Sequence, residues 1–154
     1  MDIKKLLGQY KSIIEEIEEL ERDIKILEKQ EPKHEIDKVT GSNNEFPYQP
    51  RSFTISGYNI LEEEKRNYKI SWKKNILIKR KNKCEELKIQ IEEFISTIPD
   101  SLTRRVFRYR YIDELGWLQI AYRIGRTDES YPRKMIHDRY LESLEEGLDV
   151  KENS

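Results

Sequence analysis

The sequence contains few of the residues that build metal sites, disulfides and tight turns. Among its 154 residues are one cysteine, two histidines, six glycines and five prolines. The lone cysteine, Cys84, cannot form a disulfide within the chain, and His34 and His137 do not complete a set of zinc ligands. We therefore expect no structural metal and no cofactor, and we interpret Cys84 as a small buried apolar residue.

The chain also lacks the motifs of common enzyme sites and the long apolar runs of a membrane protein. It has no Gly-rich phosphate loop, no Ser/His/Asp or Cys/His arrangement and no isolated pair of carboxylates in an apolar setting. No run of about 18 apolar residues occurs, and the N-terminal residues do not form a basic segment followed by an apolar core. We expect a cytoplasmic protein that is not an enzyme and does not enter a membrane.

Charged residues outnumber apolar ones, at 38% against 36% of the chain, and the mean hydropathy is -0.89. So little apolar material cannot fill a thick core, and burial is expected along thin seams between helices. Because the formal net charge is only -1, any contact with nucleic acid has to come from local basic patches.

Residues 3–31 carry apolar side chains at alternating steps of three and four, which is the pattern of an a/d helical seam. Most of the other positions are charged, as on a solvated helix face. We expect this helix to end near Glu31, before Pro32. The seam consists of Ile3, Leu6, Tyr10, Ile13, Ile17, Leu20, Ile24 and Leu27.

Residues 32–59 form a predicted connector, because prolines and glycines interrupt any helical period there. Two short stretches within it, Lys38–Thr40 and Ser52–Ser56, contain β-branched residues. They either pair as a short β-hairpin or belong to a partly disordered segment, and the pairing is the interpretation that we favour.

A second long helix is predicted over Ile60–Ile98, and Pro99 ends it. Its Lys65–Lys83 segment is a basic run with no acidic residue, which is typical of a nucleic-acid contact. The acidic Glu15–Asp23 segment of the first helix offers another explanation, because an antiparallel hairpin places it beside the basic run. The match of opposite charges favours this pairing. Whether the seam closes within one chain or between the chains of a homodimer stays open.

Residues 117–125 have the pattern of the bend in a helix-turn-helix, and a helix over residues 102–112, capped by Asp100 or Ser101, is predicted before it. The helices of this motif cross closely, so the crossing needs a small residue such as Ala121. The turn needs a residue that tolerates positive φ. The residues that form this pattern are Trp117, Ile120, Ala121, Ile124 and Gly125.

The next helix is predicted to begin near residues 128–130, because Pro132 is tolerated only in the first helical turn. It continues to about Leu144, with Ile136 and Tyr140 among its inward residues. Its polar face carries Arg133, Lys134 and His137. Residues 146–154 follow as an acidic tail that we expect to fray into solvent.

This segment resembles the region-four helix-turn-helix of bacterial sigma factors, in the form found in phage late-transcription regulators of the RinA and ArpU type. The resemblance covers about a quarter of the chain. It rests on Arg108–Ile112, on Trp117-x-x-Ile120-Ala121-x-x-Ile124-Gly125, and on Ser130–Lys134 leading to Ile136-His137 and Leu141. It implies a surface for double-stranded DNA, formed by Arg104, Arg105, Arg108, Ser130, Tyr131, Arg133, Lys134 and His137. For His137, a groove or phosphate contact and an ordinary exposed helix position are both open.

Together these patterns predict an all-α protein. A long antiparallel helical hairpin over residues 1–98, with its connector, comes before a helix-turn-helix domain over residues 99–145 and a flexible tail over residues 146–154. The favoured hypothesis is a phage or prophage-type transcriptional regulator that binds promoter DNA, RNA polymerase or both in a bacterial host. The alternative is a phage assembly protein, such as a DNA-packaging adaptor, that oligomerises through its helices.

Overall fold

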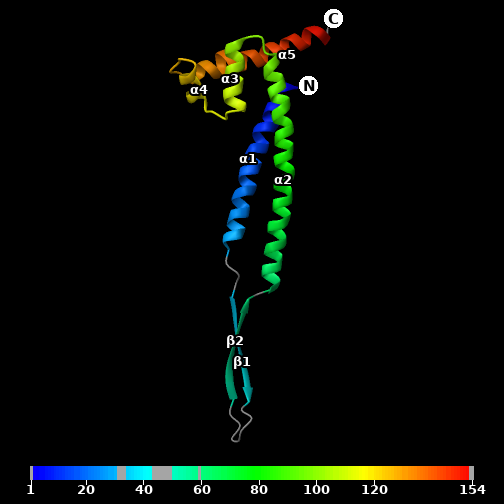
Figure 1. Ribbon diagram of the computed structural model, residues 1–154, viewed down its shortest axis with the longest axis vertical. Helices are drawn as coiled ribbons and strands as arrows, with labels where there is room; N and C mark the ends of the chain where they lie inside the picture. The colour runs from blue at the N-terminus through cyan, green and yellow to red at the C-terminus, as the bar shows by residue number, and fades with distance from the viewer. Residues whose placement is uncertain (1, 31–33, 43–49, 59, 153–154) are drawn as a thin grey trace. The chain divides into compact units, whose positions relative to one another are not determined.

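The computed structural model describes residues 2–30, 34–42, 50–58 and 60–152, with side chains for residues 2–30 and 61–147. Most of the described chain is helical (Figure 1). The two long helices lie where the apolar seams predict them. In chain order the elements are α1 (Ile3–Lys29), β1 (His34–Ser42), β2 (Pro50–Tyr58), α2 (Ile60–Thr97), α3 (Ser101–Tyr111), α4 (Trp117–Arg123), the π-helical η1 (Tyr131–Asp138) and α5 (Arg139–Glu152).

The chain forms two compact units, and both long helices contribute to each of them. Unit 1 consists of Met1–Ile17 and Arg80–Ser154, and unit 2 consists of Glu18–Lys79. Unit 1 therefore contains the short C-terminal helices together with the first turns of α1 and the last turns of α2. Unit 2 contains the remaining turns of α1 and α2 and the two strands.

In unit 2, ion pairs join the C-terminal part of α1 to the N-terminal part of α2. Lys73 Nζ lies 2.8 Å from Asp23 Oδ2, and Lys74 Nζ lies 2.7 Å from Glu28 Oε1. The hydrogen bond from Lys73 lowers the pKa of Asp23. The contact between Lys73 and Asp23 places the basic run beside the acidic segment of the same chain, as the charge pattern predicts. Glu28 lies beyond that segment.

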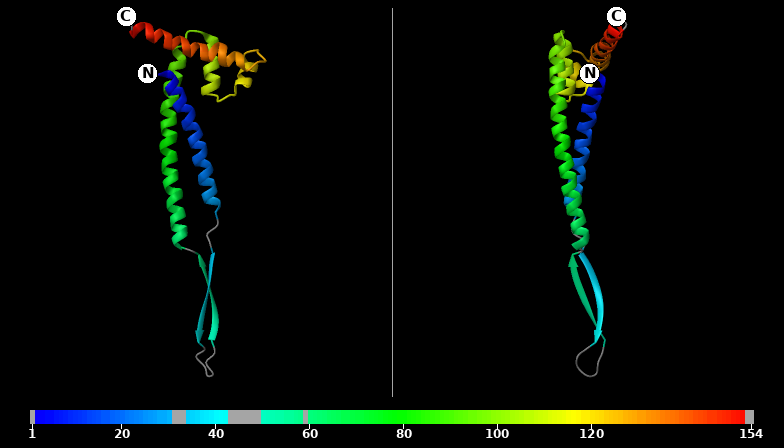
Figure 2. Two further views of the ribbon diagram at one scale, coloured as in Figure 1. Left: turned by 180° about the vertical axis from the view of Figure 1, so that it is seen from behind. Right: turned by 90° about the vertical axis from the view of Figure 1, so that its right-hand side faces the viewer.

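The strands of unit 2 form one antiparallel pair, a twisted two-stranded ribbon (Figure 2). The register runs from His34 opposite Tyr58 to Ser42 opposite Pro50. Both β-branched stretches of the connector lie inside this ladder, with Lys38 opposite Thr54. Backbone pairing extends beyond these stretches, because each strand covers 9 residues.

The core of unit 1 is built by helices from both ends of the chain. Figures 1 and 2 show α5 passing close to the start of α1, while η1 lies beside α3. Fully burying one large apolar side chain contributes about 1.5–3 kcal/mol, so this cluster is the main source of stability in the unit. Its buried members are Leu6, Leu7, Tyr10, Ile13, Leu87, Ile91, Ile98, Phe107 and Leu141.

The predicted boundary between residues 98 and 99 does not separate two cores. Leu7 of α1, Ile91 of α2, Phe107 of α3 and Leu141 of α5 belong to one buried cluster. The physical reason is that the short C-terminal helices carry apolar residues on a second side, and the ends of the long helices cover that side. Residues 99–145 thus do not form an independent domain.

The predicted tail is also wrong in part, because α5 continues to Glu152. The sequence over residues 146–152 contains no proline, and the single Gly147 does not end the helix that begins at Arg139. Within unit 1 this helix is tied to α1 by an ion pair, in which Lys4 Nζ lies 2.8 Å from Glu145 Oε1.

Candidate nucleic-acid interface

Helix α3 begins at a well-formed cap and buries one of its faces. Asp100 is the N-cap, and its Oδ2 accepts hydrogen bonds of 2.8 Å from both the backbone N and the Oγ1 of Thr103. These bonds lower the pKa of Asp100. Val106 and Phe107 are fully buried, which leaves Arg105 and Arg108 on the exposed side.

Arg104, which the resemblance assigns to phosphate contact, makes hydrogen bonds within the protein. Its Nη1 donates to the carbonyl oxygen of Ile98 at 2.7 Å and to that of Pro99 at 3.1 Å. The last carbonyl groups of a helix have no backbone N–H partner within the helix, and a basic side chain can donate hydrogen bonds to them. Arg104 therefore connects α3 to the end of α2, a structural role that its sequence context does not reveal.

Helix α4 packs by the face that the sequence predicts. Ile120 and Ala121 are fully buried, while Trp117 and Ile124 are partly buried against the same neighbours. Ile120 forms a second buried cluster with Val106 of α3 and Ile136 of η1. Because Ala121 is fully buried, a larger side chain at this position would have to displace its neighbours.

The turn after α4 depends on the left-handed conformation of Gly125, which has a φ of 80°. The N–H of Gly125 donates to the carbonyl of Tyr122 at 3.2 Å, and that of Arg126 donates to the carbonyl of Ala121 at 2.8 Å. This pair of bonds is the Schellman arrangement, which satisfies the last carbonyls of a helix. The predicted bend is present at the predicted residue.

We expect Gly125→Ala to lower the free energy of unfolding by about 1 kcal/mol, because a Cβ disfavours positive φ. No crowding contributes, since a Cβ on Gly125 meets no atom within 4 Å. Urea denaturation followed by circular dichroism measures the change. Gly8→Ala, at an equally open position inside α1, is the matched control and should raise stability by about 0.5–1 kcal/mol. Equal effects of the two substitutions would contradict the assignment of strain to Gly125.

The next helical segment, η1, begins at Tyr131, close to the predicted start. Ser130 comes directly before it, and both its backbone N and its Oγ donate to the carboxylate of Asp128. Pro132 is the second residue of η1, where its missing N–H removes no intrahelical bond. All eight residues of η1 form a π-helix. The residues that face the core therefore differ from those that an α-helix would place there.

His137 is buried, so both predicted positions for it, a DNA contact and an exposed helix site, are wrong. Only 7% of its surface is exposed. Its ring stacks on Phe107 with 4.8 Å between centroids and meets the ring of Trp117 at 5.0 Å. The two adjacent residues Ile136 and His137 both face inward, which the expected α-helical periodicity did not place together. Phe107 supplies the apolar ring that covers the imidazole.

Hydrogen bonds fix the tautomer of this buried imidazole. The Nδ1 of His137 lies 2.8 Å from Asp138 Oδ1, and its Nε2 lies 2.6 Å from the hydroxyl of Tyr111. A carboxylate only accepts, so Nδ1 carries the proton and Nε2 accepts from Tyr111. Burial lowers the pKa of His137 despite the opposing effect of Asp138, and burial raises the pKa of Tyr111 to about 12. Both groups are therefore neutral near pH 7.

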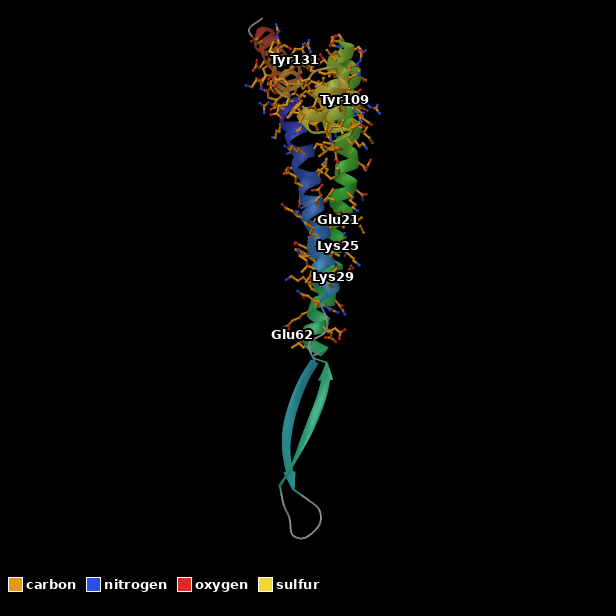
Figure 3. All side chains as sticks on the ribbon, turned by 90° about the vertical axis from the view of Figure 1, so that its left-hand side faces the viewer. Glu21, Lys25, Lys29, Glu62, Tyr109 and Tyr131 are labelled. Carbon is orange, nitrogen blue, oxygen red and sulfur yellow. The ribbon has the colours of Figure 1, made fainter. Side chains whose placement is uncertain are left out.

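Arginine side chains lie against tyrosine rings on the outer side of the second buried cluster. The guanidinium carbon of Arg105 lies 5.7 Å from the ring centroid of Tyr109, and that of Arg123 lies 5.3 Å from it. Arg126 lies 4.0 Å above the ring of Tyr131. Figure 3 labels both tyrosines, which come from α3 and η1. Arg105 also donates from its Nη2 to the hydroxyl of Tyr109 at 3.2 Å. The guanidinium groups of Arg123 and Arg126 are held against the rings while their N–H edges stay available to an anion.

Comparisons with protein-family models, curated proteins and solved structures found no match. No helix in the described ranges is both long and apolar enough to cross a membrane. Within those ranges, no three His, Cys, Asp or Glu side chains are grouped so that they could hold a metal ion.

The residues predicted at the DNA surface differ in their exposure and in their contacts with the rest of the protein. Arg105, Arg108 and Lys134 are exposed, and Arg133 is partly exposed. Ser130 forms hydrogen bonds with Asp128. Tyr131 packs against the second buried cluster, and the guanidinium of Arg126 lies over its ring.

Arg123 and Arg126 were not among the residues predicted at the DNA surface. Both side chains are exposed, and each lies over a tyrosine ring. The sequence held one signal for them, since both flank the bend at Gly125, next to the helix implied to enter the groove. Their contact with Tyr109 and Tyr131 was not visible in the sequence.

Proposed function

We propose that unit 1 binds double-stranded DNA and that the protein is a transcriptional regulator of phage type. The observation that carries this proposal is the set of three arginines, Arg105, Arg123 and Arg126, held against tyrosine rings around one small core. The segment formed by α3, α4 and η1, with Ala121 at its crossing and Gly125 at its bend, supports an assignment as a helix-turn-helix.

The mechanism is binding without catalysis. Arginine contacts to phosphates supply sequence-independent affinity, and this affinity falls as salt concentration rises because counterions are released. In a helix-turn-helix the second helix enters the major groove, so η1 would present Lys134 and Arg133 there. Any preference for a sequence comes from such base contacts rather than from the phosphate contacts. RNA polymerase is the protein partner that the resemblance implies.

The test compares the double variant Arg123→Ala, Arg126→Ala with the unchanged chain on a fluorescently labelled DNA duplex. Removing two phosphate contacts should flatten the slope of log K against log salt by about two. At low salt we expect Kd to rise at least about tenfold, which corresponds to about 1.4 kcal/mol. Fluorescence anisotropy across a salt series measures both quantities.

The control is the double variant Lys25→Ala, Lys29→Ala, which removes the same charge from exposed positions of α1 in unit 2 (Figure 3). It should leave the salt slope unchanged. An equal loss of DNA affinity in both double variants would indicate general charge attraction and not a defined binding surface. The absence of any binding at low salt would remove DNA from the proposal.

A second candidate function, assembly through the helices, is favoured by an apolar stripe on α2 in unit 2. Leu61, Tyr68 and Trp72 are 61%, 73% and 52% exposed. Their spacing of seven and four residues places them on one helix face, and an exposed aromatic stripe is typical of a contact surface. Mass measurement in solution separates the candidates, because a ring-sized oligomer favours assembly and a monomer or dimer favours regulation.

A further inference from the structure

Unit 1 contains a hollow that the proposed DNA surface does not use. Its volume is about 260 Å³, and residues of α1, α3, α4, η1 and α5 line it. One part of its wall is apolar or aromatic, with Leu7, Tyr111, Trp117 and Leu141. The other part is basic, with Lys4, Lys11 and Arg110. We call this feature the basic hollow.

The cations of the basic hollow differ in how far the protein already uses them. Arg110 is held in place, since its Nη1 donates to the carbonyl of Leu115 at 3.1 Å and its guanidinium lies 4.7 Å from the ring centroid of Trp117. Lys4 is paired with Glu145. Lys11 is exposed and forms no hydrogen bond or ion pair with the described residues. Arg110 is thus held in place, Lys4 is paired at the surface, and Lys11 is available to a ligand in the same space.

Gly8 keeps part of the basic hollow open. It lines the hollow from inside α1, where a glycine lowers helix stability by about 0.5–1 kcal/mol relative to alanine. The protein's own packing does not require this glycine, because a Cβ built on it meets no atom within 4 Å. The free space above Gly8 adds room beside Lys11, which lies one helical turn further along the same helix.

We propose that the basic hollow binds a small aromatic anion. Its carboxylate or phosphate group pairs with Lys11 and Arg110, and its ring lies against the apolar wall that includes Trp117. The volume is below the range of about 300–1,000 Å³ that is usual for drug-sized ligands, so the ligand is small. The proposal does not depend on DNA binding. It gives the protein an effector site in the same unit as the proposed DNA surface.

Fluorescence of Trp117 provides the test, in full-length protein that carries Trp72→Phe so that only the indole in the hollow is observed. The probes are benzoate and adenosine monophosphate, which carry a ring with a carboxylate or with a phosphate. Adenosine and inorganic phosphate are the controls that lack the charge or the ring. We expect one of the two probes to bind with a Kd of about 1 mM or tighter, and the controls to bind at least about tenfold more weakly.

Variants then locate the binding. Lys11→Ala should raise the Kd about tenfold, as expected for the loss of one charged hydrogen bond. Lys5→Ala, at an exposed position of the same helix outside the hollow, should leave it unchanged. Gly8→Leu should block the probe while circular dichroism shows an intact helical fold. If neither probe binds, or if Lys5→Ala and Lys11→Ala have the same effect, the proposal is overturned.

Discussion

Phe107→Ala is expected to lower the free energy of unfolding by about 3–5 kcal/mol, the usual cost of removing a buried phenyl ring. Phe107 is fully buried. Its ring meets Phe94 at 5.8 Å, Tyr140 at 5.7 Å and His137 at 4.8 Å between centroids. Helices α2, η1 and α5 therefore lose a common partner. Since small domains are stable by only about 5–15 kcal/mol, much of the unit's stability would be lost.

The measurement is urea denaturation of full-length protein with Trp72→Phe, followed by the fluorescence of Trp117, whose ring lies near His137. Tyr122→Ala is the control, because Tyr122 is an aromatic residue of α4 that is 61% exposed. It should change stability by no more than about 0.5 kcal/mol. A loss below about 1 kcal/mol for Phe107→Ala would contradict the shared core.

Acid should destabilise unit 1 through His137. Burial lowers the pKa of His137 from its ordinary value of 6.5, so between the two pKa values the unfolded chain binds more protons than the folded chain. The free energy of unfolding is then highest above pH 6.5 and falls as the pH drops. The slope approaches about 1.4 kcal/mol per pH unit until the folded pKa is reached. Denaturation midpoints between about pH 7.5 and about pH 5 measure it.

The comparison is made in chains that carry His34→Gln, so that His137 is the remaining histidine. His137→Gln should remove most of the slope. Asp138→Asn should extend the loss to lower pH, because the carboxylate of Asp138 opposes the effect of burial. Carboxylates with lowered pKa values, such as that of Asp100, respond only below their ordinary value of 3.8. An unchanged slope in His137→Gln would contradict a buried neutral imidazole.

The fold was predictable wherever a local rule decides it. The a/d seams placed both long helices, and the prolines at positions 32 and 99 lie just beyond their ends. The opposite charges of Asp23 and Lys73 indicated the pairing observed in unit 2. Gly125 was identified as the bend because few other residues adopt a φ of 80°.

The candidate site was only partly predictable, because side-chain partners come from distant parts of the chain. The sequence pattern placed His137 on a polar, exposed face. In the structure the ring of Phe107 covers it and the hydroxyl of Tyr111 hydrogen-bonds to its Nε2, and both residues come from α3. Arg104 looked available to a phosphate, yet it donates to two carbonyls at the end of α2. Neither partner can be inferred from spacing along one helix.

The sequence by itself determined the positions of the two long helices, where they end and which of their faces is apolar. These properties depend on residues within a few turns of one another, and charge and proline positions are enough to fix them. Only the tertiary structure decided that the ends of α1 and α2 share a core with α3 and α5. It also decided which arginines are stacked on tyrosines and which cations face the basic hollow. Those features depend on where separate helices meet, and local patterns do not encode those meeting points.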